Sequence, residues 1–327
     1  MTCVYQFDPA AWEADGDRES PLAETWRCPH DAHADADRCL FHLPPDRREE
    51  LGVDAAAVET ALRRAAAADG RRTKEFVGAH LPAATLDHLV VDAADRYPID
   101  LRHARIEGTF AARDADLRQP IDLRDARIDA VDWREAAFAH RCDLSGVTVA
   151  GRFDVTSATF EGDVDVVGAR FRDRVLFEEA RFHGDTCLRE TVYEADASFD
   201  GVEFRGDANL KDDDACFEDA TFRAAASFRK AVFRYADFVG VAFREPVSFD
   251  EATFTGDGEF RDAAFDADAS FRGAEFHGDA NVLYDDADFS GVRFGGDAAF
   301  ARAEFALANF SNATFAGDAV FDDAVFE

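Results

Sequence analysis

Bulky apolar residues recur along most of this 327-residue chain at intervals that alternate between five and six. The residue two positions before each is small, most often Ala. A helix needs apolar residues about 3.6 apart and a half-buried strand needs them 2 apart, so neither element explains the period. The pattern instead predicts a coil of short straight sides, each with two inward side chains and then a corner. The series begins Phe160, Val166, Phe171, Phe177, Phe182, Leu188, Tyr193, Phe199, Phe204, Leu210.

Gly-Asp pairs recur at the predicted corners. Gly adopts positive φ without steric cost, and Asp hydrogen-bonds within its own turn. We therefore expect these glycines to supply the backbone conformation of repeated tight turns. The pairs begin at Gly162, Gly184, Gly206, Gly256, Gly278, Gly296 and Gly317.

The repeat resembles that of the pentapeptide-repeat family, most plainly in Ala236-Asp237-Phe238-Val239-Gly240 and in Ala308-Asn309-Phe310-Ser311-Asn312. The resemblance implies an all-β fold, a right-handed four-sided parallel β-helix with one repeat on each side. The chain departs from the family pattern in alternating five and six residues, so we expect bulged corners.

The sequence divides into three regions. Residues 76–327 carry the β-helix, residues 46–75 form a helical cap, and residues 1–45 form a small Cys/His module. A solenoid needs a cap because its first turn otherwise exposes apolar side chains and unpaired backbone groups. The cap is predicted to contain an amphipathic helix over residues 54–68, with Val58, Leu62 and Ala65 on its apolar face.

The Cys/His module has the spacing of a metal site. Cys39 and His42 are three residues apart, which places two side chains at two corners of one tetrahedron, and Cys28 and Cys3 supply the other two. Three thiolates and one imidazole leave no open position for water. We predict a structural Zn²⁺ ion held by Cys3, Cys28, Cys39 and His42.

Two alternatives to this ligand set stay open. His30 or His33 replaces one of the four ligands, or the cysteines are free thiols and the histidines are solvated. Disulfides are not expected, because we predict a cytoplasmic chain.

The remaining cysteines indicate no second site. Cys142 falls at an inward position, where it is a compact apolar residue. Cys187 and Cys216 fall one residue before a bulky residue and are expected to face outward. They are counted as five sides apart and are therefore not expected to pair with each other. The copies of a 72-residue repeat each carry one seven-residue step, at Asp212-Asp213-Asp214 and at Asp285-Asp286-Ala287, which we predict to lie on adjacent faces.

The formal net charge of −32 excludes a phosphate-binding protein that relies on a basic patch, so no direct nucleic-acid contact is expected. The charge density is similar before and within the repeat. With only three lysines among 36 basic residues, the composition resembles that of halophilic archaea. No apolar stretch reaches the roughly 18 residues of a membrane helix, and no signal peptide is recognised, so a cytoplasmic chain without a membrane partner is expected.

We find no phosphate loop, nucleophile elbow or distinct carboxylate pair, and therefore expect no enzyme. The sequence favours a protein-interaction scaffold with a protein partner. The family resemblance implies an alternative, a DNA mimic that binds DNA gyrase. Because the repeat runs to Phe326 without a second cap, we also expect a homodimer through the C-terminal coil.

Overall fold

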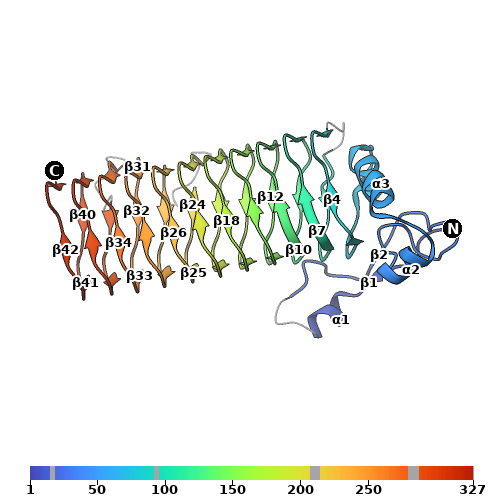
Figure 1. Cartoon of the computed structure of the whole chain (residues 1–327), viewed down its shortest axis with the longest axis horizontal. Helices are drawn as coiled ribbons and strands as arrows, with labels where there is room; N and C mark the ends of the chain where they lie inside the picture. Colours follow the sequence, from blue (N-terminus) through green and yellow to red (C-terminus); the bar gives the residue numbers. More distant parts are fainter. Residues whose placement is uncertain (15–18, 92–95, 207–213, 279–286, 327) are drawn as a thin grey trace.

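The computed structural model describes residues 1–14, 19–91, 96–206, 214–278 and 287–326. Short strands wind into a rod of stacked coils, with the N-terminal helices at one end and the C-terminus at the other (Figure 1). Within the rod, each strand pairs in parallel with the strand at the same place in the next coil, which gives four ladders. The predicted four-sided parallel β-helix is confirmed.

We number the faces in chain order. Face 1 contains β6 (Ile99–Asp100), β9 (Ile121–Asp122), β12 (Cys142–Asp143), β16 (Val164–Asp165), β20 (Thr186–Cys187), β24 (Ala215–Cys216), β28 (Ala236–Asp237), β32 (Gly258–Glu259), β36 (Ala287–Asp288) and β40 (Ala308–Asn309). Face 2 contains β3 (His80–Leu81), β7 (Arg105–Ala111), β10 (Arg127–Asp132), β13 (Thr148–Val149), β17 (Arg170–Phe171), β21 (Val192–Tyr193), β25 (Thr221–Phe222), β29 (Ala242–Phe243), β33 (Ala264–Phe265), β37 (Arg293–Phe294) and β41 (Thr314–Phe315).

Strands β7 and β10 continue round the corner onto face 3. Face 3 also contains β4 (Ala84–Thr85), β14 (Phe153–Asp154), β18 (Val175–Leu176), β22 (Ala197–Ser198), β26 (Ala226–Ser227), β30 (Val247–Ser248), β34 (Ala269–Ser270), β38 (Ala298–Ala299) and β42 (Ala319–Val320). Face 4 contains β5 (Val90–Val91), β8 (Asp116–Leu117), β11 (Ala137–Phe138), β15 (Thr159–Phe160), β19 (Arg181–Phe182), β23 (Glu203–Phe204), β27 (Val232–Phe233), β31 (Thr253–Phe254), β35 (Glu275–Phe276), β39 (Glu304–Phe305) and β43 (Val325–Phe326).

The bulky side chains form one column inside each face. The ring of Phe249 stacks on Phe228 at 4.7 Å and on Phe271 at 4.9 Å, at the separation of neighbouring strands. On face 3 of an early coil, Phe110 takes the preceding position and Ala112 the column position, and both are fully buried. The interior of the coil is therefore filled with side chains.

The corners differ from the prediction. The residues with a left-handed backbone (positive φ) lie two positions after the bulky column residue on faces 1 and 3. Asp262 on face 1 (φ 57°) and Glu251 on face 3 (φ 58°) are examples. Five of the Gly-Asp glycines do not have positive φ, and there the prediction is wrong. A Cβ on Gly184 would lie 2.5 Å from the carbonyl carbon of Gly162, so glycine is needed there because successive coils approach closely. The five are Gly162, Gly184, Gly256, Gly296 and Gly317.

The register also corrects two predictions about the second half of the coil. Strand β20 pairs with β24, with Cys187 directly opposite Cys216, so these cysteines are one coil apart and not five sides apart. Cys216 is buried and does not face solvent. The spacing counts Leu210 as the bulky residue of one side of the coil. The strand pairing shows instead that one full coil runs from Leu188 to Phe217. Leu210 itself lies outside the described residues.

The predicted acidic steps fall largely in residues 207–213 and 279–286, outside the described residues. The described strands that flank them are β23 and β35 on face 4 and β24 and β36 on face 1. The prediction that the two steps lie on adjacent faces therefore falls on residues that the structure does not describe.

The first coil is covered by segments that precede it. A two-stranded antiparallel sheet, β1 (Gln6–Phe7) and β2 (Trp26–Arg27), is accompanied by α1 (Pro9–Ala14), α2 (Pro45–Glu50), α3 (Ala55–Ala67) and a 3₁₀ helix (Arg71–Lys74). Helix α3 is the predicted helix, with Asp54 accepting the capping hydrogen bond from the N–H of Ala57. It buries Val58, Leu62 and Ala66, so Ala66 takes the place predicted for Ala65.

Candidate metal centre

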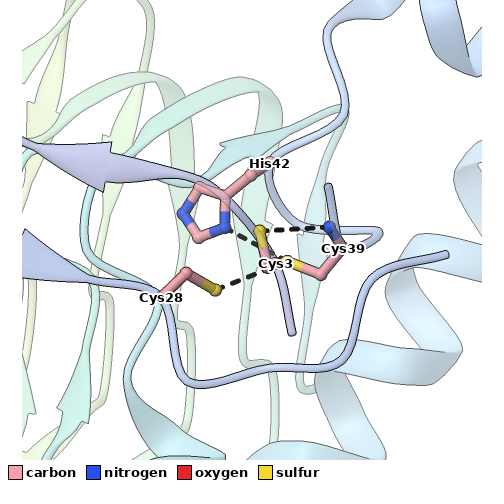
Figure 2. Close-up of side chains that lie close together, drawn as sticks. All are labelled: Cys3, Cys28, Cys39 and His42. Atoms are coloured by element: carbon pink, nitrogen blue, oxygen red, sulfur yellow. Dashed lines mark hydrogen bonds between the residues drawn. The ribbon is translucent and has the colours of Figure 1, made fainter. Parts of the chain in front are cut away.

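Three cysteines and one histidine meet between the N-terminal sheet and the first coil. One possible ligand atom from each of Cys3, Cys28, Cys39 and His42 lies within 4.8 Å of the others, and all four residues are buried (Figure 2). Backbone bonds hold the segment of Cys3 beside that of Cys28, because the N–H of Cys28 donates to Tyr5 O at 3.1 Å and the N–H of Cys3 donates to His30 O at 2.9 Å. Cys39 and His42 share a turn in which the N–H of His42 donates to Cys39 O at 3.0 Å.

The distances fit one tetrahedral ion. Two thiolates bound to zinc at about 2.3 Å lie about 3.8 Å apart. The sulfurs of Cys28 and Cys39 are 3.7 Å apart, and Nδ1 of His42 is 3.1 Å from the sulfur of Cys39. The backbone N–H of Cys39 also donates to the sulfur of Cys3 at 3.2 Å. The group could hold a metal ion, and its four donors would fill a tetrahedral shell.

The protonation of the cluster favours charged ligands. Hydrogen bonds from Cys28 and His42 lower the pKa of Cys39 to about 4 despite its burial, and the same Cys28–Cys39 bond raises the pKa of Cys28. Burial lowers the pKa of His42, but hydrogen bonds to Cys3 and Cys39 outweigh burial and raise it to about 9. A thiolate beside an imidazolium can exchange the proton for a cation, because metal binding requires deprotonated ligands.

The surroundings of His42 fix the orientation of its ring. Its Nε2 donates to Val77 O at 3.0 Å, which leaves Nδ1 directed at the sulfurs, and the ring stacks on Tyr5 at 4.0 Å. Such an outer hydrogen bond holds the imidazole in the tautomer that a metal needs. The same bond ties the cluster to the first coil.

The alternative ligands His30 and His33 lie outside this group. The Nε2 of His30 bonds Glu75 O at 2.9 Å, and its ring stacks on Phe76 at 5.3 Å. Nδ1 of His33 accepts the N–H of Asp35 at 3.4 Å within a local turn. Both imidazoles are therefore engaged elsewhere.

The N-terminal segment also covers the open edge of the first coil. Carbonyl groups of this coil that would otherwise accept hydrogen bonds from a preceding coil accept them from side chains of residues 30–63: Glu75 O from His30, Val77 O from His42, His80 O from Arg48, and Thr85 O and Asp87 O from Arg63. The N–H of His80 donates to Phe41 O at 2.8 Å. The sequence predicts a cap but not these hydrogen bonds. Nothing in the sequence around a His or an Arg indicates which distant backbone carbonyl its side chain will bind.

Comparison with known proteins supports the repeat. A family model described as pentapeptide repeats (9 copies) matches residues 238–282 and 282–325. The crystal structure of HetL, described as a pentapeptide repeat protein involved in heterocyst differentiation regulation from the cyanobacterium Nostoc sp. strain PCC 7120, matches at 17% identity and a TM-score of 0.26. That match covers 76% of this chain and 85% of HetL. No curated protein sequence matches the chain. No helix in the described ranges is long and apolar enough to cross a membrane.

Proposed function

This chain is a pentapeptide-repeat protein, and on that premise we propose that it is a non-enzymatic scaffold whose outer faces bind a protein partner. One observation carries the proposal: the columns of bulky side chains fill the interior. Phe238, for example, is fully buried between Phe217 at 4.7 Å and Phe260 at 4.9 Å. A filled coil offers recognition on its surface rather than in a pocket.

The outer faces carry ordered rows of charge that suit such recognition. On face 1, Arg102 bonds Asp100 at 2.7 Å in its own coil and reaches Asp122 of the next coil at 3.5 Å. Arg124 repeats the arrangement with Asp122 at 2.6 Å. These pairs lie partly buried along the face, and they hold the charged side chains in a fixed pattern that a partner can read.

The alternative of a DNA mimic finds support only in the last coils. Residues 101–150 carry eight Arg against nine Asp and Glu, whereas residues 251–327 carry four Arg against 17. Within the coil, the charge is therefore uneven. A mimic of duplex DNA needs negative charge along the whole bound length, since both DNA strands are charged throughout. The neutral first coils favour the scaffold.

A photo-crosslinking residue tests the scaffold. It is placed in the full chain in four separate variants, one at an outward strand position of each face: Glu259 on face 1, Ala242 on face 2, Ser248 on face 3 and Thr253 on face 4. We expect one face to capture a defined protein and the other faces to capture none. Absence of any captured protein from all four faces would contradict the proposal.

A supercoiling assay with purified gyrase in high salt separates the two functions. The scaffold predicts unchanged supercoiling. Inhibition at equimolar protein would favour the DNA mimic.

We also propose that Zn²⁺ occupies the Cys3, Cys28, Cys39 and His42 cluster as a structural ion. The 3.7 Å between the sulfurs of Cys28 and Cys39 supports a shared ion. Elemental mass spectrometry of the purified chain should find about one zinc per chain, lost in Cys39→Ser and kept in Cys142→Ser. Zinc absent from the wild-type chain would exclude the site.

Finally, we propose a homodimer through the last coil. Val320, Val325 and Phe326 are exposed there, and the outer edges of β40 to β43 have no following strand among the described residues. A monomeric mass by light scattering at micromolar concentration would exclude this dimer.

A further inference from the structure

Cys187 and Cys216 are neighbours across two coils of face 1. They are register partners in the parallel strands β20 and β24, and each lies one residue before a bulky column residue. Directly opposite Cα atoms in paired strands lie about 4.8 Å apart, within the range of about 4.4–6.8 Å that a disulfide spans. Register partners also direct their side chains to the same side of the sheet. The backbone therefore places the two Cα atoms within the span of a disulfide.

The two thiols differ in access. Cys187 is half-buried, and Cys216 is only 1% exposed. They hydrogen-bond to each other, and of the two residues only Cys187 is partly exposed to solvent. Cys142 lies two coils earlier on the same face, but it points into the tube and bonds His140 O. It serves as an internal control.

The surroundings favour a thiolate at Cys187. The hydrogen bond from Cys216, followed by the backbone N–H and the charge of Arg189, lowers the pKa of Cys187 to about 7 in spite of burial. The same hydrogen bond and burial raise the pKa of Cys216. Arg189 is held in place by Glu218, with its Nε 2.7 Å from the carboxylate. A partly exposed, low-pKa thiol next to a second thiol is the arrangement that reacts with oxidants.

We propose that Cys187 and Cys216 form an oxidation site for hydrogen peroxide, with Cys187 as the attacking residue and Cys216 as the resolving residue. The Cys187 thiolate attacks one peroxide oxygen, the O–O bond breaks, and the released hydroxide takes a proton to leave as water. Cys187 is then a sulfenic acid. The sulfur of Cys216 attacks the sulfur of Cys187, the S–O bond breaks, and a second water leaves with the proton of Cys216. Two thiols lose two electrons to one peroxide, and a disulfide links two successive coils.

Peptide mapping under non-reducing conditions tests the proposal on the full-length chain after treatment with equimolar peroxide. We expect an intramolecular link between the peptides that contain Cys187 and Cys216, formed with the loss of two hydrogen atoms and reversed by a thiol reductant. The link should form equally in Cys142→Ser. The peptide map should show no link from Cys187 or Cys216 to Cys3, Cys28 or Cys39, which separates this disulfide from oxidation of the N-terminal cluster.

Two single variants assign the roles. In Cys216→Ser the sulfenic acid at Cys187 should persist and be trapped by dimedone, whereas in Cys187→Ser the buried Cys216 should stay reduced. Circular dichroism confirms that both variants keep the coil. Recovery of Cys187 and Cys216 as free thiols after peroxide, or of Cys187 as a sulfinic acid beside a free Cys216, would overturn the proposal.

Discussion

Tyr193 takes the place of a phenylalanine in the column of face 2, with its ring between Phe171 at 5.5 Å and Phe222 at 4.4 Å. The residue is fully buried, and its hydroxyl has no hydrogen-bond partner among the described residues. Burial raises the pKa of this phenol well above its usual value. A buried hydroxyl without a partner loses its hydration and gains nothing in return.

We predict that Tyr193→Phe raises the free energy of unfolding by about 1–3 kcal/mol, the cost of an unsatisfied polar group. The measurement is the urea midpoint of the purified chain. Phe222→Tyr, which places a hydroxyl in the next coil of the same column, should lower the midpoint. A less stable Tyr193→Phe would show that the hydroxyl does have a partner.

Asp237 makes the free energy of unfolding depend on pH, and the sign of this dependence is opposite to that of an ion-paired carboxylate. Burial raises the pKa of Asp237 to about 6, even though its carboxylate accepts the N–H of Val239 at 2.8 Å. The folded state therefore favours the neutral acid, and the stability from this group is present below the unfolded pKa of 3.8 and lost as pH rises through about 6. At pH 7 the buried charge is a cost.

Asp237→Asn should therefore raise the denaturation midpoint at pH 7 and leave it nearly unchanged at pH 4. Asn309 shows that the amide fits, because it occupies the same place on face 1 and accepts the N–H of Ser311 at 2.9 Å. The exposed Asp322→Asn serves as the control. An equal effect of Asp237→Asn at both pH values would exclude titration as the cause.

At the scale of the strand, the small residue and the bulky residue two positions later both point into the coil and together fill a limited volume. On face 1 the first coils combine Ile99 with Leu101, whereas later coils combine Ala236 with Phe238. At Gly258 the limiting neighbour belongs to the adjacent face 4 column, since a Cβ there would lie 3.0 Å from the ring of Phe254. A larger column residue thus requires a smaller partner two positions earlier, as expected for an interior packed like a crystal.

Ala236→Val should consequently lower the free energy of unfolding by about 1–3 kcal/mol through overpacking. The double variant Ala236→Val with Phe238→Leu should regain part of that loss, because the two side chains share one space. Ala225→Val, at an exposed corner, serves as the matched control. Equal midpoints for Ala236→Val and the wild-type chain would show that the interior holds spare volume.

The strands were predictable from the sequence because each depends on a local pattern, a small residue two before a bulky one. Leu210 satisfies that pattern and was counted as a side, although one coil runs directly from Leu188 to Phe217. Only the pairing of β20 with β24 reveals this, and pairing depends on residues that are distant in sequence. The role of Gly184 was mistaken for the same reason, since the backbone that excludes its Cβ belongs to the previous coil. Spacing likewise indicated the cysteine cluster, but not the hydrogen bond from His42 to Val77 O.

At the scale of the whole molecule, the rod has two unlike ends. At the N-terminal end, side chains from His30 to Arg63 occupy the edge carbonyls of the first coil. The last described coil presents exposed Val325 and Phe326 and open strand edges. With the cap in place, the proposed homodimer joins two last coils, because contact between two identical surfaces closes at a dimer.

Loss of the proposed zinc should change this outcome. His42 both belongs to the metal cluster and bonds Val77 O, so release of the cluster frees the first edge. A free first edge fits the open last edge of another copy, and such a head-to-tail contact does not close but extends into filaments. We predict that a chelator, or Cys39→Ser, converts dimers into particles whose mass by light scattering rises with protein concentration.

The control blocks the other end. Val320→Lys with Val325→Lys places charges on the last strands, a substitution that prevents edge pairing. This double variant should be monomeric with zinc and remain monomeric after chelation, because a filament needs both ends. Growth of the blocked variant after chelation would assign the association to an unfolded N-terminal segment rather than to a free strand edge. An unchanged mass of the wild-type chain after complete zinc removal would show that α3 and its arginine contacts close the first coil without the metal.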